Sequence, residues 1–360
     1  MRVSDVTLRE GEQTSGVSYD VDEKIEAGLL LDRLDVDYIQ AGFPVIGETE
    51  QKVVSELSAS TDTTVTAMAR AIPGDVEAAA AADADMAHVF ATTQERQLEY
   101  MIGKSREEVL ENWRDAVDLA YDHGMDARIA SVDAFRTEVD HLVDLYELFD
   151  DVDLVGFSDT VGCRTPEFVT SRLTELEERG VDLDRLSVHF HDDLGLSNAN
   201  ALAAAGLGVG NVDVSVGGVG ERAGNTALEE FAAATNISGI DLNVDITQVV
   251  PVCREVLNVL GEEYGVRKAL LGDEVYRHES GLHTGAMLEE PSVFEPWDPS
   301  RFGAKRELVF GETSGRRAAV GLLERADRKV DEATIEALLA ALAEQGPMGL
   351  DPAIELARDV

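Results

Sequence analysis

Short apolar segments alternate with helix-forming segments along the first two thirds of the chain, and this alternation restricts the possible folds. Buried strands are predicted at Val3–Leu8, Tyr38–Ala41, Thr64–Ala67, Met86–Ala91, Ala127–Val132, Leu154–Phe157, Leu186–His191 and Val212–Val216. Helices are predicted between them, at Val21–Leu34, Thr49–Ser58, Gly74–Ala82, Arg106–Asp122, Val139–Phe149, Pro166–Arg179, Ser197–Gly206 and Thr226–Ile237. Eight strand–helix pairs over about 240 residues match an α/β fold of the (β/α)₈ TIM-barrel type. An open, doubly wound sheet is the alternative, because periodicity does not show whether a sheet closes.

The pattern changes after residue 240. Helix-like segments at Asp245–Tyr264, Ser314–Ala326 and Glu332–Glu344 flank a stretch rich in loops, Gly272–Arg306. We therefore expect residues 1–240 to form a TIM-barrel catalytic domain and residues 241–360 a smaller, mostly helical C-terminal region. The second part is too short for another barrel, so we expect it to pack on the first domain or on a second subunit.

The charge of the chain is extreme, with 71 acidic residues against 30 Lys and Arg and a net charge of −41. Such a surface repels nucleic acids and anionic lipid headgroups, which makes both poor partners. The acidic residues are spread along the whole chain, which favours adaptation to a salt-rich, halophilic cytoplasm. We expect neither a leader segment nor a membrane span, since no apolar run approaches the ~18 residues that a span needs. Cys163 and Cys253 are expected to be reduced and buried.

Charged and imidazole side chains gather at the predicted carboxyl ends of four strands, where TIM barrels carry their active sites. The most informative pair is His189 and His191, because residues i and i+2 of a strand face the same side. Such a pair alone is more often ordinary polar packing. With Glu10 as a third ligand, two imidazoles and a carboxylate can hold a metal ion and leave positions open for substrate. Arg9 beside Glu10 is either a structural ion pair or a group that stabilises an enolate or alkoxide oxygen.

Seven motifs in a fixed order resemble a known family, the acetyl-CoA-dependent 2-oxo acid synthases, which comprise 2-isopropylmalate, homocitrate and citramalate synthases. The motifs are Thr7–Gln13, Ala41–Pro44, Ser158–Gly162, His189–Gly195, Gly218–Asn225, His278–His283 and Phe302–Arg306. The resemblance covers roughly residues 3–325. It implies a metal-dependent acyltransferase of amino-acid biosynthesis with a TIM barrel. It also implies a Claisen-type condensation of acetyl-CoA with a 2-oxo acid.

The resemblance also assigns the residues of the site. Glu10, His189 and His191 would hold a divalent ion (Zn²⁺, Mn²⁺ or Mg²⁺), with Asn225 close by. Thr160 would bind the carboxylate of the 2-oxo acid, which chelates the metal.

Further assignments concern catalysis and substrate choice. Arg9 would polarise the keto group and steady the acetyl-CoA enolate. His283 would take part in proton transfer from the C-terminal region of a partner subunit, which implies a homodimer. Arg128 matches an arginine that some homocitrate synthases use for a distal carboxylate, and a surface arginine that neutralises nearby acids is the equal alternative. The motif Phe302–Leu308 also favours the homocitrate branch.

Four positions depart from the family pattern. Val132 stands in place of a glutamate and Phe294 in place of a tyrosine, so two groups associated with proton transfer are missing. Gln40 replaces a glutamate and Asp192 an asparagine. The alternative function is therefore a divergent paralogue that keeps the metal but has a regulatory or binding role. The chain stops before the regulatory domain of leucine-inhibited relatives, so leucine feedback is not expected. The related hydroxymethylglutaryl-CoA lyases are less similar, since this chain has no cysteine in the glycine loop after the eighth strand.

Overall fold

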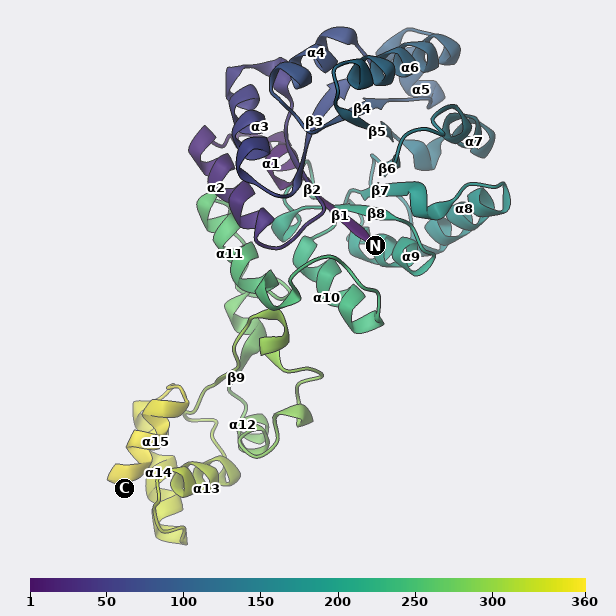
Figure 1. The fold of residues 1–360 in the computed structure, drawn as a ribbon. Coiled ribbons are helices and arrows are strands. Elements are labelled where there is room, and N and C mark those ends of the chain that lie inside the picture. The colour runs from purple at the N-terminus through teal and green to yellow at the C-terminus, as the bar shows by residue number, and fades with distance from the viewer. The chain divides into compact units, whose positions relative to one another are not determined.

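Eight parallel strands close into a barrel in which each strand pairs with its neighbour in sequence and β8 pairs with β1 (Figure 1). The computed structural model describes residues 1–360. The strands are β1 (Arg2–Asp5), β2 (Tyr38–Gly42), β3 (Thr64–Arg70), β4 (Met86–Ala91), β5 (Asp126–Ser131), β6 (Val155–Asp159), β7 (Leu186–Phe190) and β8 (Asn211–Val214). The predicted TIM barrel is confirmed, and closure between β1 and β8 excludes the open sheet.

Helices follow the strands around the barrel, as predicted. The long ones are α2 (Val21–Asp32), α3 (Glu48–Ser60), α4 (Pro73–Ala81), α6 (Arg106–Asp122), α7 (Val139–Leu148), α8 (Pro166–Glu178), α9 (Ser197–Gly206) and α10 (Leu228–Ser238). Local sequence fixes where several begin. At α2, the Asp20 carboxylate accepts the Glu23 backbone N–H at 2.9 Å, and the Glu23 carboxylate accepts the Asp20 N–H at 2.7 Å. This capping box satisfies two otherwise unpaired donors.

The first strand is shorter than predicted. We expected Val3–Leu8, but β1 ends at Asp5 and a helical turn, α1 (Thr7–Glu10), follows. The Asp5 carboxylate accepts both the backbone N–H of Thr7, at 2.9 Å, and its hydroxyl, at 3.0 Å. A short acidic side chain that binds the backbone two residues ahead competes with strand pairing. The apolar run therefore leaves the sheet, and Arg9 and Glu10 lie on a helical turn.

The chain divides into two compact units, Met1–Glu263 and Tyr264–Val360. The boundary between them lies about 20 residues later than the one expected after residue 240. Helix α11 (Val249–Val259) explains the difference, because it packs against α2 and α10 and so belongs with the barrel. Six of its residues are buried and recur at the helical spacing that forms one apolar face: Val249, Val250, Val252, Cys253, Val256 and Leu257. Cys253 is buried as expected, but Cys163 is exposed, and both thiols are free.

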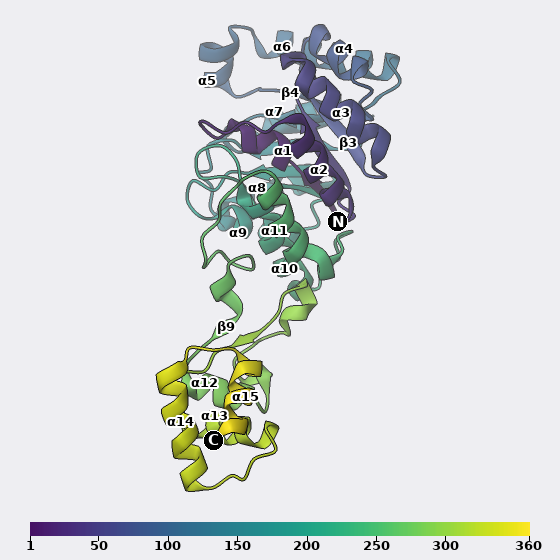
Figure 2. The ribbon, with the colours of Figure 1, turned by 90° about the vertical axis from the view of Figure 1, so that its left-hand side faces the viewer.

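The second unit is mostly helical. It contains α12 (Gly281–Met287), α13 (Arg316–Arg325), α14 (Glu332–Gln345) and α15 (Leu350–Asp359), and a short parallel pair of β9 (Arg277–His278) with β10 (Glu307–Leu308). Helices α13, α14 and α15 pack on one another (Figure 2) around Phe310, Leu322 and Leu338, which are completely buried. Helices α12 and α15 were not predicted. None of the helices in the chain has both the length and the apolar character needed to cross a membrane.

Candidate active site and metal centre

A pocket of about 220 Å³ lies at the carboxyl ends of the barrel strands. Residues from all eight strands or the loops after them line it: Arg9, Glu10, Gln13, Phe43, Met68, His88, Phe90, Ala130, Val132, Ser158, Thr160, His189, His191, Asp213 and Glu221. One side is charged and the opposite side is apolar. A small ligand with a polar head and a less polar tail fits this division.

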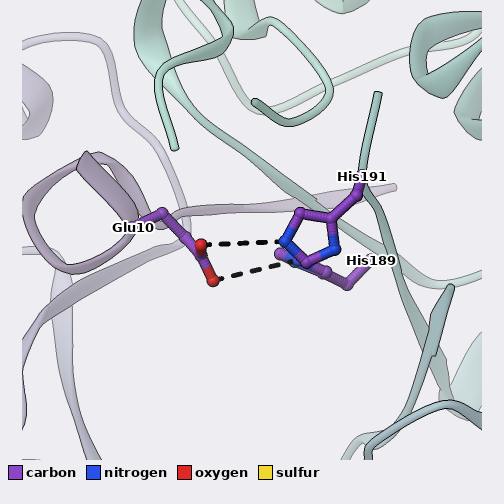
Figure 3. A group of neighbouring side chains, drawn as sticks. All are labelled: Glu10, His189 and His191. Carbon is purple, nitrogen blue, oxygen red and sulfur yellow. Dashed lines mark ion pairs between the residues drawn. The ribbon is translucent and has the colours of Figure 1, made fainter. Parts of the chain in front are cut away.

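Glu10, His189 and His191 converge in this pocket (Figure 3). Glu10 ends the turn α1, His189 lies on β7, and His191 follows β7 directly. Nε2 of His189 lies 3.9 Å from one Glu10 carboxylate oxygen, and Nε2 of His191 lies 3.9 Å from the other. The potential ligand atoms of the three residues all lie within 4.8 Å of one another, and all three side chains are buried. The structure brings together the three metal ligands expected from the sequence.

The protonation and hydrogen bonding of these residues fit a divalent cation. Both ring nitrogens of His191 and the amide oxygen of Asn225 are buried without a hydrogen-bond partner in the protein. Burial, followed by the nearby His189, lowers the pKa of His191 to about 4, so its imidazole is neutral and can ligate. Burial alone would raise the pKa of Glu10, but Arg9 and the two histidines hold that pKa below its usual value. Neutral imidazoles and an ionised carboxylate are the forms that bind metal.

A buried ion pair between Arg128 and Asp213 lies beside the Nδ1 edge of the His189 ring. Nδ1 of His189 lies 3.6 Å from an Asp213 carboxylate oxygen, and Arg128 donates to the other oxygen at 2.9 Å. Burial opposes ionisation of Asp213, but Arg128 and His189 lower its pKa far below the usual range. Asp213 thus directs Nδ1 of His189 away from the pocket and leaves Nε2 for a ligand, as carboxylates behind metal-binding histidines commonly do.

Arg128 itself does not line the pocket. Its guanidinium also donates to the hydroxyl groups of Ser4, at 2.7 Å, and Ser187, at 3.1 Å. Arg128 is only 1% exposed, so the interpretation as a surface arginine is wrong. The resemblance implies that Arg128 contacts a distal carboxylate of the substrate, and the structure does not support this contact. Arg128 lies on β5, two residues before the pocket residue Ala130. Its positive charge is already paired with the Asp213 carboxylate.

The glycine-rich loop after β8 brings Asn225 close to Glu10. Gly220 has φ of 151°, and a Cβ on this residue would lie 2.2 Å from the Asn225 amide nitrogen and 3.6 Å from the Glu10 Cβ. Asn225 in turn donates to the Val219 carbonyl at 3.0 Å, which leaves its own oxygen free. Only glycine permits this close approach. The loop therefore places an oxygen ligand beside the triad.

Arg9 connects the metal triad to the floor of the pocket. Its guanidinium forms an ion pair with Glu10 and donates from Nε to the Gln40 amide oxygen at 2.6 Å. The Gln40 amide nitrogen lies 2.7 Å from Nδ1 of His88. Sequence reasoning missed His88, although a histidine within the apolar run Met86–Ala91, two residues from the inward-facing Phe90, was an available signal.

Thr160 lines the pocket where the loop after β6 begins. Its hydroxyl oxygen accepts the backbone N–H of Asp133 at 2.9 Å, so the hydroxyl proton remains available to a ligand. Its carbonyl accepts from Arg222, which also forms two hydrogen bonds with Asp193, at 2.8 and 2.9 Å. These contacts tie the loops after β6, β7 and β8 together. At the end of the neighbouring strand β5, Val132 contributes only an apolar surface to the pocket.

A larger cavity of about 560 Å³ adjoins this pocket and shares Phe90 and Val132 with it. Most of its lining is apolar; it consists of Arg70, Ala71, Ile72, Phe90, Ala91, Thr92, Met101, Ile102, Lys104, Val109, Asn112 and Val132. Arg70 is held by Asp75 through two hydrogen bonds, at 2.7 and 2.9 Å. A largely apolar ligand fits this cavity.

His283 belongs to the second compact unit, on α12. Its ring stacks on Phe294, with the centroids 3.8 Å apart. In the same unit Glu295 accepts from Arg306 and lies 3.5 Å from His278. Two of the motifs that carry the family resemblance, His278–His283 and Phe302–Arg306, are therefore joined through Glu295.

Two family models together match most of the chain. One, described as HMGL-like, matches residues 1–256, and another, described as homocitrate synthase post-HMGL domain-like, matches residues 270–347. The chain belongs to the HMGL-like family. The gap between the two matched regions contains the boundary between the two compact units.

Three relatives of this HMGL-like protein come from Methanopyrus kandleri. The chain is 38% identical to its homocitrate synthase AksA, over 96% of this chain and 87% of that protein. It is 36% identical to a putative (R)-citramalate synthase CimA, over 97% of this chain and 69% of the relative. It is 37% identical to a probable 2-isopropylmalate synthase, over 97% of this chain and 70% of that relative. All three relatives are named as synthases, each of a different product.

Solved structures agree with the family in fold. The Bacillus subtilis HMG-CoA lyase superposes with a TM-score of 0.65 at 20% identity, over 75% of this chain and 96% of the lyase. An Acinetobacter baumannii HMG-CoA lyase gives a TM-score of 0.64 at 21% identity, over 73% and 92%. At these identities the likeness supports the barrel fold alone.

Proposed function

We propose that this HMGL-like protein is a metal-dependent acyltransferase that condenses the acetyl group of acetyl-CoA with a 2-oxo acid, in amino-acid biosynthesis. The observation that carries the proposal is the buried Glu10–His189–His191 triad with Arg9 beside it. The relatives named as homocitrate, citramalate and 2-isopropylmalate synthases support the same reaction. In this reaction the acetyl methyl group loses a proton, its carbon bonds to the keto carbon, and the keto oxygen gains a proton. Water then cleaves the thioester and releases CoA.

The residues around the triad have distinct roles in this proposal. A divalent ion held by the triad, Zn²⁺, Mn²⁺ or Mg²⁺, would act as a Lewis acid on the keto group. Asn225 would offer its unpaired oxygen to this ion. Thr160 donates its free hydroxyl proton to the carboxylate of the 2-oxo acid. Arg9 donates toward the oxygen on which negative charge develops, where a fixed cation in a buried site is most effective.

We assign the adjoining 560 Å³ cavity to the pantetheine arm of acetyl-CoA. Its apolar walls suit the arm, and the shared residues Phe90 and Val132 allow the thioester to reach the metal pocket. Lys104 on the lining would then meet the phosphate groups. In a chain with a net charge of −41, a lysine on this lining supplies a positive charge for an anionic group.

The C-terminal region completes the proposal. We infer a homodimer in which the C-terminal unit, Tyr264–Val360, contributes His283 to proton transfer in the partner's barrel. We further infer that the protein is halophilic and lies in the cytoplasm. The acidic composition and the two free thiols support this inference.

A divergent paralogue with a binding or regulatory role is the second candidate. One observation favours it: Val132 faces the metal pocket without a titratable group where the family pattern has a glutamate. Such a protein would bind metal and a 2-oxo acid but turn over slowly.

An assay of CoA thiol release separates the two candidates. Purified protein in molar KCl with Mg²⁺, Mn²⁺ or Zn²⁺ is given acetyl-CoA and a panel of 2-oxo acids, with the Glu10→Gln variant as the matched control. Release that depends on both the metal and one 2-oxo acid supports the acyltransferase. If no 2-oxo acid stimulates release above the Glu10→Gln background, the acyltransferase proposal fails.

A further inference from the structure

The hydrogen-bonded chain from Arg9 through Gln40 fixes the protonation of His88. The Nε of arginine can only donate, so the oxygen of the Gln40 amide must face it, at 2.6 Å. The amide nitrogen therefore faces His88, and since this nitrogen also only donates, Nδ1 of His88 must accept, at 2.7 Å. An imidazole that accepts at Nδ1 carries its proton on Nε2.

Nε2 of His88 is consequently a buried donor without a partner in the protein. His88 is 2% exposed and lines the metal pocket. Burial, followed by the charge of Arg128, holds the pKa of His88 well below its usual value, in agreement with a neutral ring. A buried donor that lacks an acceptor is costly, so such groups usually meet a ligand or water.

The other residues on this side of the pocket cannot supply that acceptor. Met68, Phe90 and Ala130 are apolar. His88 pairs in register with Arg128 on the neighbouring strand, and Arg128 has only donors. The acceptor must therefore come from whatever occupies the pocket.

We propose that His88 donates a hydrogen bond from Nε2 to an uncharged oxygen in the side chain of the 2-oxo acid. This inference rests on the proposed function and names the class of substrate: 2-oxo acids with a side-chain hydroxyl or carbonyl oxygen. The charges disfavour a second carboxylate, because the carboxylates Glu10, Asp213 and Glu221 already line the pocket. The cations beside these carboxylates are already paired, Arg9 with Glu10, Arg128 with Asp213 and Arg222 with Glu221, so no unpaired cation is left for a second carboxylate.

Gln40 decides what His88 presents to the ligand. A glutamate at position 40 would accept from Nδ1–H and leave either a bare Nε2 or an imidazolium ring. The departure from the family pattern at position 40 thus converts this nitrogen into a neutral donor. The amide does so only because Arg9 fixes its orientation.

The binding test compares two ligands of equal size on the metal-loaded protein. Calorimetry with 2-oxo-4-hydroxybutanoate and 2-oxopentanoate, which differ by a hydroxyl in place of a methyl group, should show tighter binding of the hydroxy acid by about 10-fold. His88→Leu should abolish the preference, and His88→Gln, which keeps a donor near Nε2, should retain most of it. 2-Oxoglutarate should bind more weakly than the hydroxy acid. Equal binding of the first pair to the wild-type protein, or tightest binding of 2-oxoglutarate, would overturn the inference.

Nitrogen-15 NMR of the histidine side chains gives a readout independent of turnover. His88, assigned by its loss in His88→Leu, should show a proton on Nε2, and Gln40→Glu should move the proton to Nδ1 or protonate both nitrogens. A proton on Nδ1 in the wild-type protein would refute the tautomer. If CoA release is absent with every 2-oxo acid while the binding preference persists, the proposed reaction fails and the role of His88 stands. If none of the three ligands binds, the role of His88 fails as well.

Discussion

The imidazole of His283 lies against the phenyl ring of Phe294, with centroids 3.8 Å apart and planes inclined by 32°. A phenyl ring buries one face of the imidazole but cannot exchange a proton with it. Two positions that the family pattern associates with proton transfer, Val132 in the barrel pocket and Phe294 beside His283, therefore carry no titratable group.

The first prediction restores both positions. Val132→Glu with Phe294→Tyr should raise kcat by about 10-fold or more and change KM less, because a positioned general base contributes roughly 10²- to 10⁴-fold to proton transfer. Steady-state kinetics of CoA release measures both constants. The matched control is Val132→Gln with Phe294→Tyr, because glutamine has the size and shape of glutamate but cannot act as a base. A double variant no faster than this control would mean that another carboxylate, such as Asp133, already serves as the base.

The second prediction concerns the metal. His191→Ala should lower the bound metal from about one ion per chain to less than roughly a tenth of that, since one carboxylate, one imidazole and a neutral amide oxygen hold a divalent ion poorly. Metal analysis after dialysis gives the stoichiometry. His123→Ala, at the end of helix α6 and away from the triad, should retain a full complement. Unchanged stoichiometry in His191→Ala would contradict the assignment of the site.

The third prediction tests the shared active site. Arg9→Ala and His283→Ala should each be nearly inactive, but mixing them under conditions of subunit exchange should restore part of the activity. A heterodimer that combines the intact barrel of one chain with the intact C-terminal region of the other explains the rescue. Exchange is followed by mass spectrometry of tagged chains. No recovery despite demonstrated exchange would exclude a site built from two subunits.

The fourth prediction concerns salt. The Debye length shortens from ~10 Å at 0.1 M salt to ~3 Å at 1 M, so self-repulsion of a chain with a net charge of −41 falls as salt is added. The melting temperature should therefore rise steeply with KCl over this interval, and NaCl should act similarly. Scanning calorimetry provides the measurement. A melting temperature that does not vary with KCl would rule out the halophilic interpretation.

The fifth prediction concerns the adjoining cavity. Lys104→Ala should raise KM for acetyl-CoA several-fold and leave KM for the 2-oxo acid unchanged, because an exposed contact between a lysine and a phosphate contributes roughly 1 kcal/mol. Lys104→Arg keeps the charge and should stay close to the wild type. An effect on the 2-oxo acid alone would reassign this cavity to that substrate.

Much of the barrel could be predicted from the sequence, because buried parallel strands are continuous apolar runs with clear ends. The predicted strand Met86–Ala91 coincides with β4. The prediction at Val3–Leu8 was wrong because a single side-chain contact, from Asp5 to Thr7, outweighed the apolar pattern. Helix α15 was missed although Ala353 and Ala357 bury one face, because alanines four residues apart give only a weak apolar signal.

Some side chains of the candidate site could be predicted from the sequence, and others could not. Glu10, His189 and His191 could be predicted, since strand ends meet at one face of a barrel whatever the details of packing. Arg128 and His88 could not be distinguished by pattern, because both are polar residues at matching positions of neighbouring strands. Which of them points a free donor into the pocket depends on Asp213 and Gln40, which are distant in sequence.

The early end of β1 determines how two consecutive residues can serve one pocket. On a strand, Arg9 and Glu10 would project to opposite sides, one into the barrel and the other toward the surrounding helices. On the turn α1 they are separated by about 100° of rotation, and both line the pocket. The cation Arg9 and the metal ligand Glu10 are therefore joined by a single peptide bond on one helical turn. A movement of this turn that changes the position of one side chain must also move the other.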